Sequence, residues 1–215
     1  MKSHLTDCGI PGVGVVPYGI HMCHFYPARA ELVDGLIPYF AAGLERDERC
    51  LWIASPPVSA IEIAAEIPRY PEMERAFRSG QLKILDGTEW HGDLATVVAD
   101  ESLKRWIAEE EAAIADGYQG LRVANNMHFR PGVDWTYLLA YETSLHERLR
   151  GRRVVVCCSY DRGLCGPVDM LDVVRRHDAA LDRHDDHWQV FVQKTHRGRS
   201  QNGKEKQHQS ELRAE

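Results

Sequence analysis

The sequence predicts an α/β fold in which a mostly parallel central sheet is flanked by helices on both faces. Short apolar segments alternate along the chain with segments of helical periodicity, which is typical of βαβ units. Two of the apolar segments, residues 49–55 and 154–159, are almost uninterrupted runs, as expected for strands covered on both faces. The length of 215 residues suits one domain with a substantial core.

The first predicted strand, residues 19–26, is apolar and aromatic and is followed directly by Pro27. Because side chains alternate along a strand, His21, Cys23 and Phe25 should share one face. The opposite face should carry Met22, His24 and Tyr26. Further strands are expected at residues 49–55, 82–85, 121–124, 154–159 and 188–193, the last of them an edge strand. The polar atoms of the first strand either meet a small ligand or bond to one another within the core.

Helices are expected where apolar residues recur at intervals of three and four. These segments are residues 29–44, a helix capped by Ser55 that runs to Glu66, and residues 72–79, 93–116, 134–149 and 170–181. Pro38 should kink the first of them, and Asp134 is a suitable N-cap for the fifth. The expected domain covers residues 19–193. It is preceded by an arm, residues 1–18, without periodicity, and followed by a polar tail, residues 194–215, that we expect to be disordered.

Composition narrows the class of function. The net charge is −6, and because the tail carries +3 the rest of the chain carries −9, which argues against direct binding to nucleic acid. No segment has the apolar length of a membrane helix, and the N-terminus does not resemble a signal peptide. The six cysteines form no CxxC pair, and four of them lie in predicted strands. We therefore expect a protein of the reducing cytoplasm.

In parallel sheets, ligands bind beyond the carboxyl ends of the strands. In this chain those ends are Tyr26, Ser55, Asp86, residues 125–128 and residues 160–161. The glycine-rich segment 9–14 resembles a phosphate loop superficially, but no Gly-Lys-Ser/Thr follows it. The sequence therefore predicts a ligand site at this edge of the sheet and no nucleotide hydrolysis.

Several short motifs occur in a distinctive order between residues 19 and 181. They are His21-x-Cys23-x-Phe25-Tyr26, Gly43-Leu44 with Glu48-x-Cys50-Leu51-Trp52-Ile53, Gly117-Tyr118-x-Gly120-Leu121-Arg122, Tyr141-Glu142, and Cys158-x-Tyr160-Asp161 with His177 downstream. Each motif alone is weak, but their order and spacing are specific. In these motifs the chain resembles the MEDS family, the methanogen/methylotroph, DcmR sensory domain.

The resemblance implies a RecA/KaiC-like fold that has lost its phosphate loop. It also implies a non-enzymatic, prokaryotic sensor of small hydrocarbon derivatives, without a cofactor, in signal transduction or transcription regulation. Because no output domain is recognisable in the chain, the signal would pass to a separate partner: a histidine kinase, an anti-sigma-type regulator or a DNA-binding regulator. Pairing of two chains through the edge strand is left open. After the fourth strand, the family pattern leads us to expect an acidic residue and a tryptophan. Residues 125–129 depart from that pattern.

Carried over to this sequence, the resemblance implies a ligand site between the segments 21–26 and 158–160. The candidate ligand-binding residues are His21, Cys23, Phe25, Tyr26, Trp52, Arg122, Tyr141, Glu142, Cys158, Tyr160 and His177. Phe25 and Trp52 would supply the apolar wall that a weakly polar ligand needs. The alternative for Glu142 is a structural salt bridge, for which Arg122 is the expected partner.

Three other functions use the same residue types. His21, Cys23, Cys158 and His177 could hold a zinc ion or a haem, although two positions on one strand are not the usual zinc spacing. Cys23 and Cys158 could act as thiol redox sensors. A cysteine enzyme is the weaker alternative, because Cys158 continues a buried apolar run. The histidines and aspartates of residues 184–187 are better explained as a solvated turn.

Overall fold

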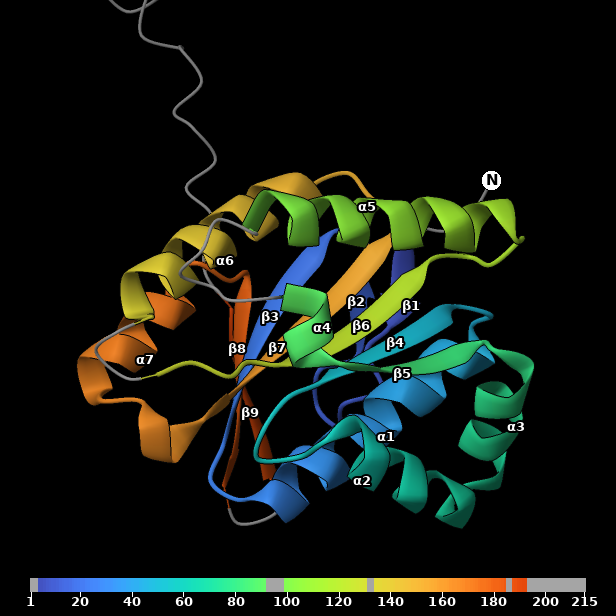
Figure 1. Ribbon diagram of the computed structural model, residues 1–215, viewed down its shortest axis with the longest axis horizontal. Helices are drawn as coiled ribbons and strands as arrows, with labels where there is room; N and C mark the ends of the chain where they lie inside the picture. Colours follow the sequence, from blue (N-terminus) through green and yellow to red (C-terminus); the bar gives the residue numbers. More distant parts are fainter. Residues whose placement is uncertain (1–3, 92–98, 131–133, 185–186, 193–215) are drawn as a thin grey trace, which may run out of the picture.

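The computed structural model describes residues 4–91, 99–130, 134–184 and 187–192 (Figure 1). Its centre is a seven-stranded sheet in the order β5-β4-β6-β7-β3-β8-β9. The strands are β3 (Ile20–Tyr26), β4 (Arg49–Ala54), β5 (Leu82–Asp86), β6 (Leu121–Asn126), β7 (Val154–Asp161), β8 (Ala179–His184) and β9 (His187–Val192). All neighbouring pairs are parallel except β8 and β9, which are antiparallel. The predicted fold class is confirmed.

Helices cover both faces of the sheet and give a three-layer structure (Figure 1). One face packs against α1 (Arg29–Glu45), α2 (Ala60–Glu66) and α3 (Pro71–Ser79). The other packs against α4 (Gly87–His91), α5 (Ala99–Ala115), α6 (Trp135–Leu149) and α7 (Pro167–Val174). Within the described residues, no helix combines the length and apolar character that a membrane crossing requires.

The two faces of β3 separate as its sequence pattern predicted. Cys23 and Phe25 belong to the core beneath α5 and α6, whereas Met22 and Tyr26 belong to the core beneath α1. In the sheet, β3 lies between β7 and β8, with Cys23 beside Cys158 on one side and beside Ala180 on the other. The strand is therefore covered on all sides, and its polar side chains need partners inside the protein.

The N-terminal segment is more ordered than the sequence suggested. Strands β1 (Leu5–Asp7) and β2 (Val15–Pro17) form a separate antiparallel pair. Thr6, Cys8 and Ile10 are buried against the α1 face. The expectation of an unstructured arm was wrong because strands of three residues are too short to show a period.

The C-terminal segment also differs from expectation. The predicted helix over residues 170–181 is replaced by α7, which ends at Val174, and by β8, which begins at Ala179. Ala179-Ala180-Leu181 continues the apolar spacing of the preceding helix, so periodicity alone could not separate the two elements. The predicted edge strand over residues 188–193 corresponds to β9, and residues 194–215 lie outside the described part of the chain.

Two predicted helix starts also change. The N-cap of α2 is Ser59 and not Ser55; its hydroxyl accepts from the Glu62 amide and Glu62 bonds back to Ser59, which is a capping box. Asp134 precedes α6 as expected, but it makes no side-chain cap bond and pairs instead with Arg130. The predicted helix over residues 93–116 begins in residues outside the description and is seen as α5 from Ala99.

Candidate functional site

Four buried side chains converge beneath α6, and we call them the polar cluster: His21, Glu142, Cys158 and His177. His21 comes from β3, Cys158 from β7, Glu142 from α6, and His177 from the turn between α7 and β8. One nitrogen, oxygen or sulfur atom of each lies within 4.8 Å of those of the other three. All four residues are buried, with exposed fractions of 0–1%.

Individual distances within the polar cluster are short. His21 Nε2 lies 3.2 Å from Glu142 Oε2 and 3.4 Å from Cys158 Sγ. His177 Nε2 lies 3.5 Å from the same Glu142 oxygen. The rings of His21 and His177 are 3.9 Å apart between centroids. Glu142 Oε2 is therefore approached by both imidazoles.

Neighbouring groups fix the orientation of the polar cluster. The hydroxyl of Tyr160 donates to Glu142 Oε1 at 2.6 Å, so Oε2 alone points at the histidines. His177 Nδ1 donates to the backbone carbonyl of Val173 in α7 at 2.8 Å, which assigns the proton to Nδ1 and leaves the Nε2 lone pair directed at Glu142. Glu142 Oε2, His177 Nε2 and His21 Nδ1 have no hydrogen-bond partner of good geometry.

The pKa shifts favour a charged Glu142 carboxylate beside a neutral His21 ring. Burial, together with the nearby His177, lowers the pKa of His21 to about 4. Burial alone would raise the pKa of Glu142, but the imidazoles of His177 and His21 beside the carboxylate outweigh this effect and hold that pKa below its usual value. Burial raises the pKa of Cys158 well above its usual value, so at neutral pH the free residue is a thiol.

Two other predicted residues lie near the polar cluster. Cys23 is on the same face of β3 and its thiol contacts the carbonyl oxygen of Ala179 at 3.7 Å. The ring of Phe25 lies 5.7 Å from that of Tyr160 between centroids. His146 of α6, which sequence reasoning missed, lies 5.9 Å from His21 between ring centroids. It would have been found by its position one helical turn after Glu142.

The remaining predicted residues lie elsewhere. Tyr26 and Trp52 belong to the core on the α1 side. The expected Arg122–Glu142 pair is wrong: Arg122 Nε donates to Glu48 at 2.6 Å, and both side chains are fully buried. Arg122 points to the α1 side of the sheet because it alternates with Leu121 and Val123, which face α5 and α6.

Tyr141 belongs to a second buried network, beside the polar cluster. Its hydroxyl accepts from Trp106 Nε1 at 2.7 Å and lies 3.3 Å from the Ser102 hydroxyl. Ser102 in turn contacts His91, whose Nε2 is 3.1 Å from Asn125 Oδ1. Sequence reasoning did not identify His91 or Ser102, because they come from two separate helices, α4 and α5, with no motif in common.

The polar cluster lies nearer the amino ends of β3 and β8 than the carboxyl edge where we expected a ligand. His21 is the second of seven residues in β3, and His177 precedes β8. The rule for parallel sheets concerns groups on loops beyond the strands. These donors are instead held on the face of the sheet under α6, so the expected position does not apply to them.

An open, mostly apolar hollow lies close to the polar cluster, and we call it the apolar groove. It has a volume of about 400 Å³ and lies between α7 and strands β8 and β9. Its lining residues are Phe25, Pro167, Met170, Leu171, Val174, Ala180, Leu181, Asp182 and Phe191. Phe25 joins the groove to the polar cluster, since its ring contacts Tyr160 and Tyr160 bonds to Glu142.

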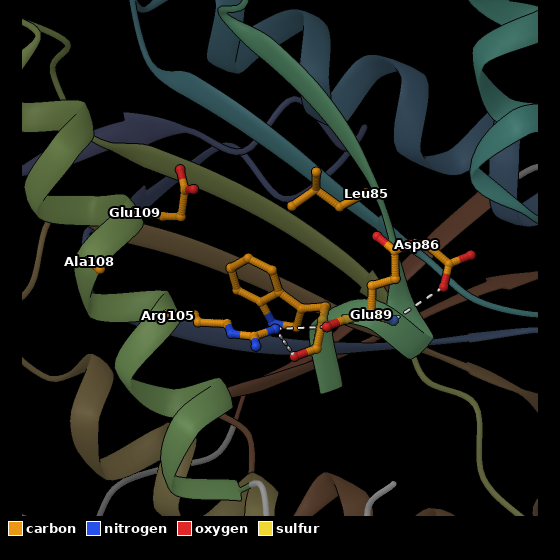
Figure 2. A pocket seen from close by; sticks show the side chains of 7 residues that line it. Leu85, Asp86, Glu89, Arg105, Ala108 and Glu109 are labelled. Carbon is orange, nitrogen blue, oxygen red and sulfur yellow. Dashed lines mark hydrogen bonds between the residues drawn. The ribbon is translucent and has the colours of Figure 1, made fainter. Parts of the chain in front are cut away.

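A second hollow, of about 290 Å³, lies at the carboxyl end of β5 between α4 and α5 (Figure 2). Arg105 spans it and donates to the backbone carbonyls of Glu89 and Trp90 at 2.7 and 3.0 Å. Asp86 accepts from the backbone amides at the start of α4. The charged groups seen in Figure 2 are thus partly used in holding α4. Asp86 is one of the strand ends where the sequence predicted a ligand, but the hollow contains none of the eleven candidate ligand-binding residues.

The family model for MEDS, the methanogen/methylotroph, DcmR sensory domain, matches residues 20–178 of this chain. The chain belongs to the MEDS family. The match contains β3, α6, β7 and all four members of the polar cluster. The sequence-based identification of a sensory domain is therefore confirmed.

Two known proteins resemble this MEDS chain. A transcriptional repressor, DcmR of Methylorubrum extorquens, is 24% identical over 168 residues, which are 76% of this chain and 60% of the repressor. The chain thus matches about 60% of the length of that relative. A crystal structure of the KaiC-like protein PH0186 from Pyrococcus horikoshii has a TM-score of 0.60 at 15% identity, covering 91% of this chain and 90% of that one. At this identity the likeness concerns the fold alone, and it confirms the RecA/KaiC-like prediction.

Proposed function

We propose that this MEDS domain is a non-enzymatic sensor of a small, weakly polar, hydrocarbon-like ligand and that it acts in transcription control. The family match and the similarity to a repressor support a sensory, regulatory role. The signalling partner in this proposal is a histidine kinase, an anti-sigma-type regulator or a DNA-binding regulator. The six cysteines are unpaired and suit the reducing cytoplasm, where we place the sensor.

The observation that carries the proposal is the connection between the apolar groove and the polar cluster. The groove is open and apolar, as a binding site for a small hydrocarbon derivative requires. It shares Phe25 with the face of β3 that holds His21. It also shares α7 with His177, because the Val173 carbonyl orients that ring. A ligand in the groove therefore contacts the helix and the strand that support the polar cluster.

A mechanism follows from these contacts. A ligand that enters between Met170 and Val174 pushes on α7, and a movement of α7 displaces the Val173 carbonyl. His177 would then change its approach to Glu142 on α6. The binding energy favours whichever arrangement of α6 and α7 accommodates the ligand, which is what a sensor requires.

The alternative enzymatic and thiol functions are less well supported. Burial raises the pKa of both Cys23 and Cys158 well above the usual value, so neither is the thiolate that nucleophilic or redox chemistry needs. Both side chains are fully buried. Pairing of two chains through the edge strand β9 stays an open alternative.

Methyl NMR of the chain labelled at methionine Cε tests the proposal. Methanol, 1-butanol and chloroform serve as probes of increasing apolar character. We expect the Met170 methyl signal to shift on addition of 1-butanol or chloroform, whereas that of Met73, which α3 buries on the opposite side of the sheet, stays fixed. Val174→Trp should fill the groove and abolish the shift. Val168→Trp is the matched control, because Val168 lies on the same helix but is 70% exposed and does not line the groove.

The proposal is wrong if no probe moves the Met170 signal at concentrations that leave the Met73 signal unchanged. It is also wrong if the Val174 and Val168 variants respond alike, since the shift would then come from nonspecific solvent effects.

A further inference from the structure

We propose that the polar cluster binds one zinc-class divalent cation through His21 Nε2, Glu142 Oε2, Cys158 Sγ and His177 Nε2. This inference goes beyond the sensor function, because it needs no organic ligand. Its donors are buried and do not line the apolar groove. It also differs from a site built on Cys23, whose thiol faces the Ala179 carbonyl.

The separations between the donor atoms match a tetrahedral ion. With bonds of about 2.0–2.3 Å from zinc to nitrogen, oxygen and sulfur, neighbouring ligand atoms of a tetrahedron lie about 3.3–3.6 Å apart. The measured separations are 3.2 Å from His21 to Glu142, 3.4 Å from His21 to Cys158 and 3.5 Å from His177 to Glu142. All four atoms lie within 4.8 Å of one another. The separations of the other pairs do not exceed 4.8 Å, so side-chain shifts of about 1 Å or less would complete the site.

Two of the four donors, His177 and Glu142, have the supporting hydrogen bonds that metal sites use. Metal-binding histidines usually donate their second ring N–H to a carbonyl or carboxylate, and ligating carboxylates are themselves hydrogen-bonded. His177 donates from Nδ1 to the Val173 carbonyl, which directs Nε2 inward. Tyr160 donates to Glu142 Oε1 and leaves Oε2 directed inward.

Hydrogen bonding inside the core does not account for the same atoms. Glu142 Oε2 and His177 Nε2 are buried and face each other without a well-formed hydrogen bond. No arginine or lysine of the described chain pairs with Glu142, and Arg122, the cation expected there, is fully used by Glu48 and backbone carbonyls. A cation between the donors satisfies both atoms and balances the buried carboxylate.

The donor set selects the class of metal. Two imidazoles, one thiolate and one carboxylate suit a borderline ion such as Zn²⁺, whereas Mg²⁺ and Ca²⁺ prefer oxygen ligands. Haem does not fit, because donors within 4.8 Å of one another leave no space for a planar macrocycle. A bound ion would link β3, β7, α6 and the α7–β8 turn. Of these elements, β3 also lines the apolar groove through Phe25, and the turn joins α7 and β8, which form its walls.

The test uses the full chain carrying Cys165→Ser, which removes the cysteine that is not fully buried. Zinc content is measured after dialysis, and zinc is then replaced by Co²⁺. A cobalt–thiolate bond gives an intense near-ultraviolet band, and tetrahedral cobalt gives strong visible bands. Cys158→Ser is compared with Cys157→Ser, a matched control whose thiol lies on the opposite face of β7.

We expect about one zinc per chain. The cobalt–thiolate band should persist in Cys157→Ser and disappear in Cys158→Ser. Tyr160→Phe, which leaves Glu142 Oε1 without its donor, should weaken cobalt binding about 10–100-fold. Absence of both zinc and the cobalt band, or a band that survives Cys158→Ser, would overturn the proposal.

Should Cys158→Ser not fold, melting of the Cys165→Ser chain in zinc and in chelator decides the question. The melting temperature must be several degrees higher with zinc, because an ion that binds only the folded state stabilises it; no difference refutes the site. The methionine NMR titration in chelator tests the apolar groove separately, so failure of either proposal leaves the other measurable.

Discussion

Replacing Glu48 with glutamine should destabilise the domain strongly and leave ligand binding unchanged. Glu48 and Arg122 are both fully buried and 2.6 Å apart. Arg122 also donates to the carbonyls of Cys8 and Tyr39 at 2.8 and 3.0 Å. Glu48 Oε1 accepts from Thr6 and from a tyrosine hydroxyl at 2.6 and 2.7 Å. The pair therefore attaches the β1–β2 hairpin to the sheet, and the substitution leaves a buried guanidinium without its counter-charge.

Removal of one partner from a buried ion pair costs about 3–5 kcal/mol. That is a large part of the total of about 5–15 kcal/mol expected for a domain. With a typical urea slope of about 2 kcal/mol/M, the midpoint of unfolding should fall by about 2 M. Urea unfolding followed by circular dichroism measures it. Glu109→Gln is the control, because its 2.9 Å pair with Lys83 is partly exposed and should contribute less than about 1 kcal/mol.

A loss below about 1 kcal/mol for Glu48→Gln would refute the structural role of this pair. If the variant had normal stability but no longer showed the Met170 response, Arg122 would have to be assigned to the ligand site.

Two further predictions concern buried polar groups outside the polar cluster. Burial, with Arg162 and Arg183 nearby, lowers the pKa of His24 to about 3 from 6.5. The unfolded chain therefore binds a proton that the folded chain does not, and stability should fall as pH drops from 6.5 towards 3. His24→Asn should flatten this slope in urea unfolding at several pH values, and an unchanged slope would contradict the burial. Tyr141→Phe leaves Trp106 Nε1 without its acceptor and should cost about 1–3 kcal/mol, with zinc and ligand binding retained; loss of either binding at normal stability would contradict this.

Much of the fold could be predicted from the sequence because local patterns carry it. The uninterrupted apolar runs at β4 and β7 marked strands covered on both faces, and alternation along β3 placed Cys23 and Phe25 on one face. The boundary between α7 and β8 could not be predicted. Apolar spacing continues across it, and the pairing of Ala179 with Met22 is a contact between distant segments.

The four members of the polar cluster could be named from the sequence, but their pairings could not. His21, Glu142, Cys158 and His177 were all identified, yet the partner of Glu142 was wrong. Arg122 and Glu142 face opposite sides of the sheet, which depends on the order of the strands. A side chain that bonds to a backbone group, as His177 does to the Val173 carbonyl, cannot be recognised from a sequence pattern.

The proposed function depends on the binding of a small apolar ligand in the apolar groove beside the polar cluster. Titration calorimetry of 1-butanol or chloroform into the full chain at several temperatures tests it most directly. Binding should be 1:1 with a negative heat-capacity change, the mark of apolar surface leaving water. Val174→Trp should abolish the binding heat and Val168→Trp should retain it. Absence of saturable heat for the unmodified chain, or equal heat for both variants, would contradict the account.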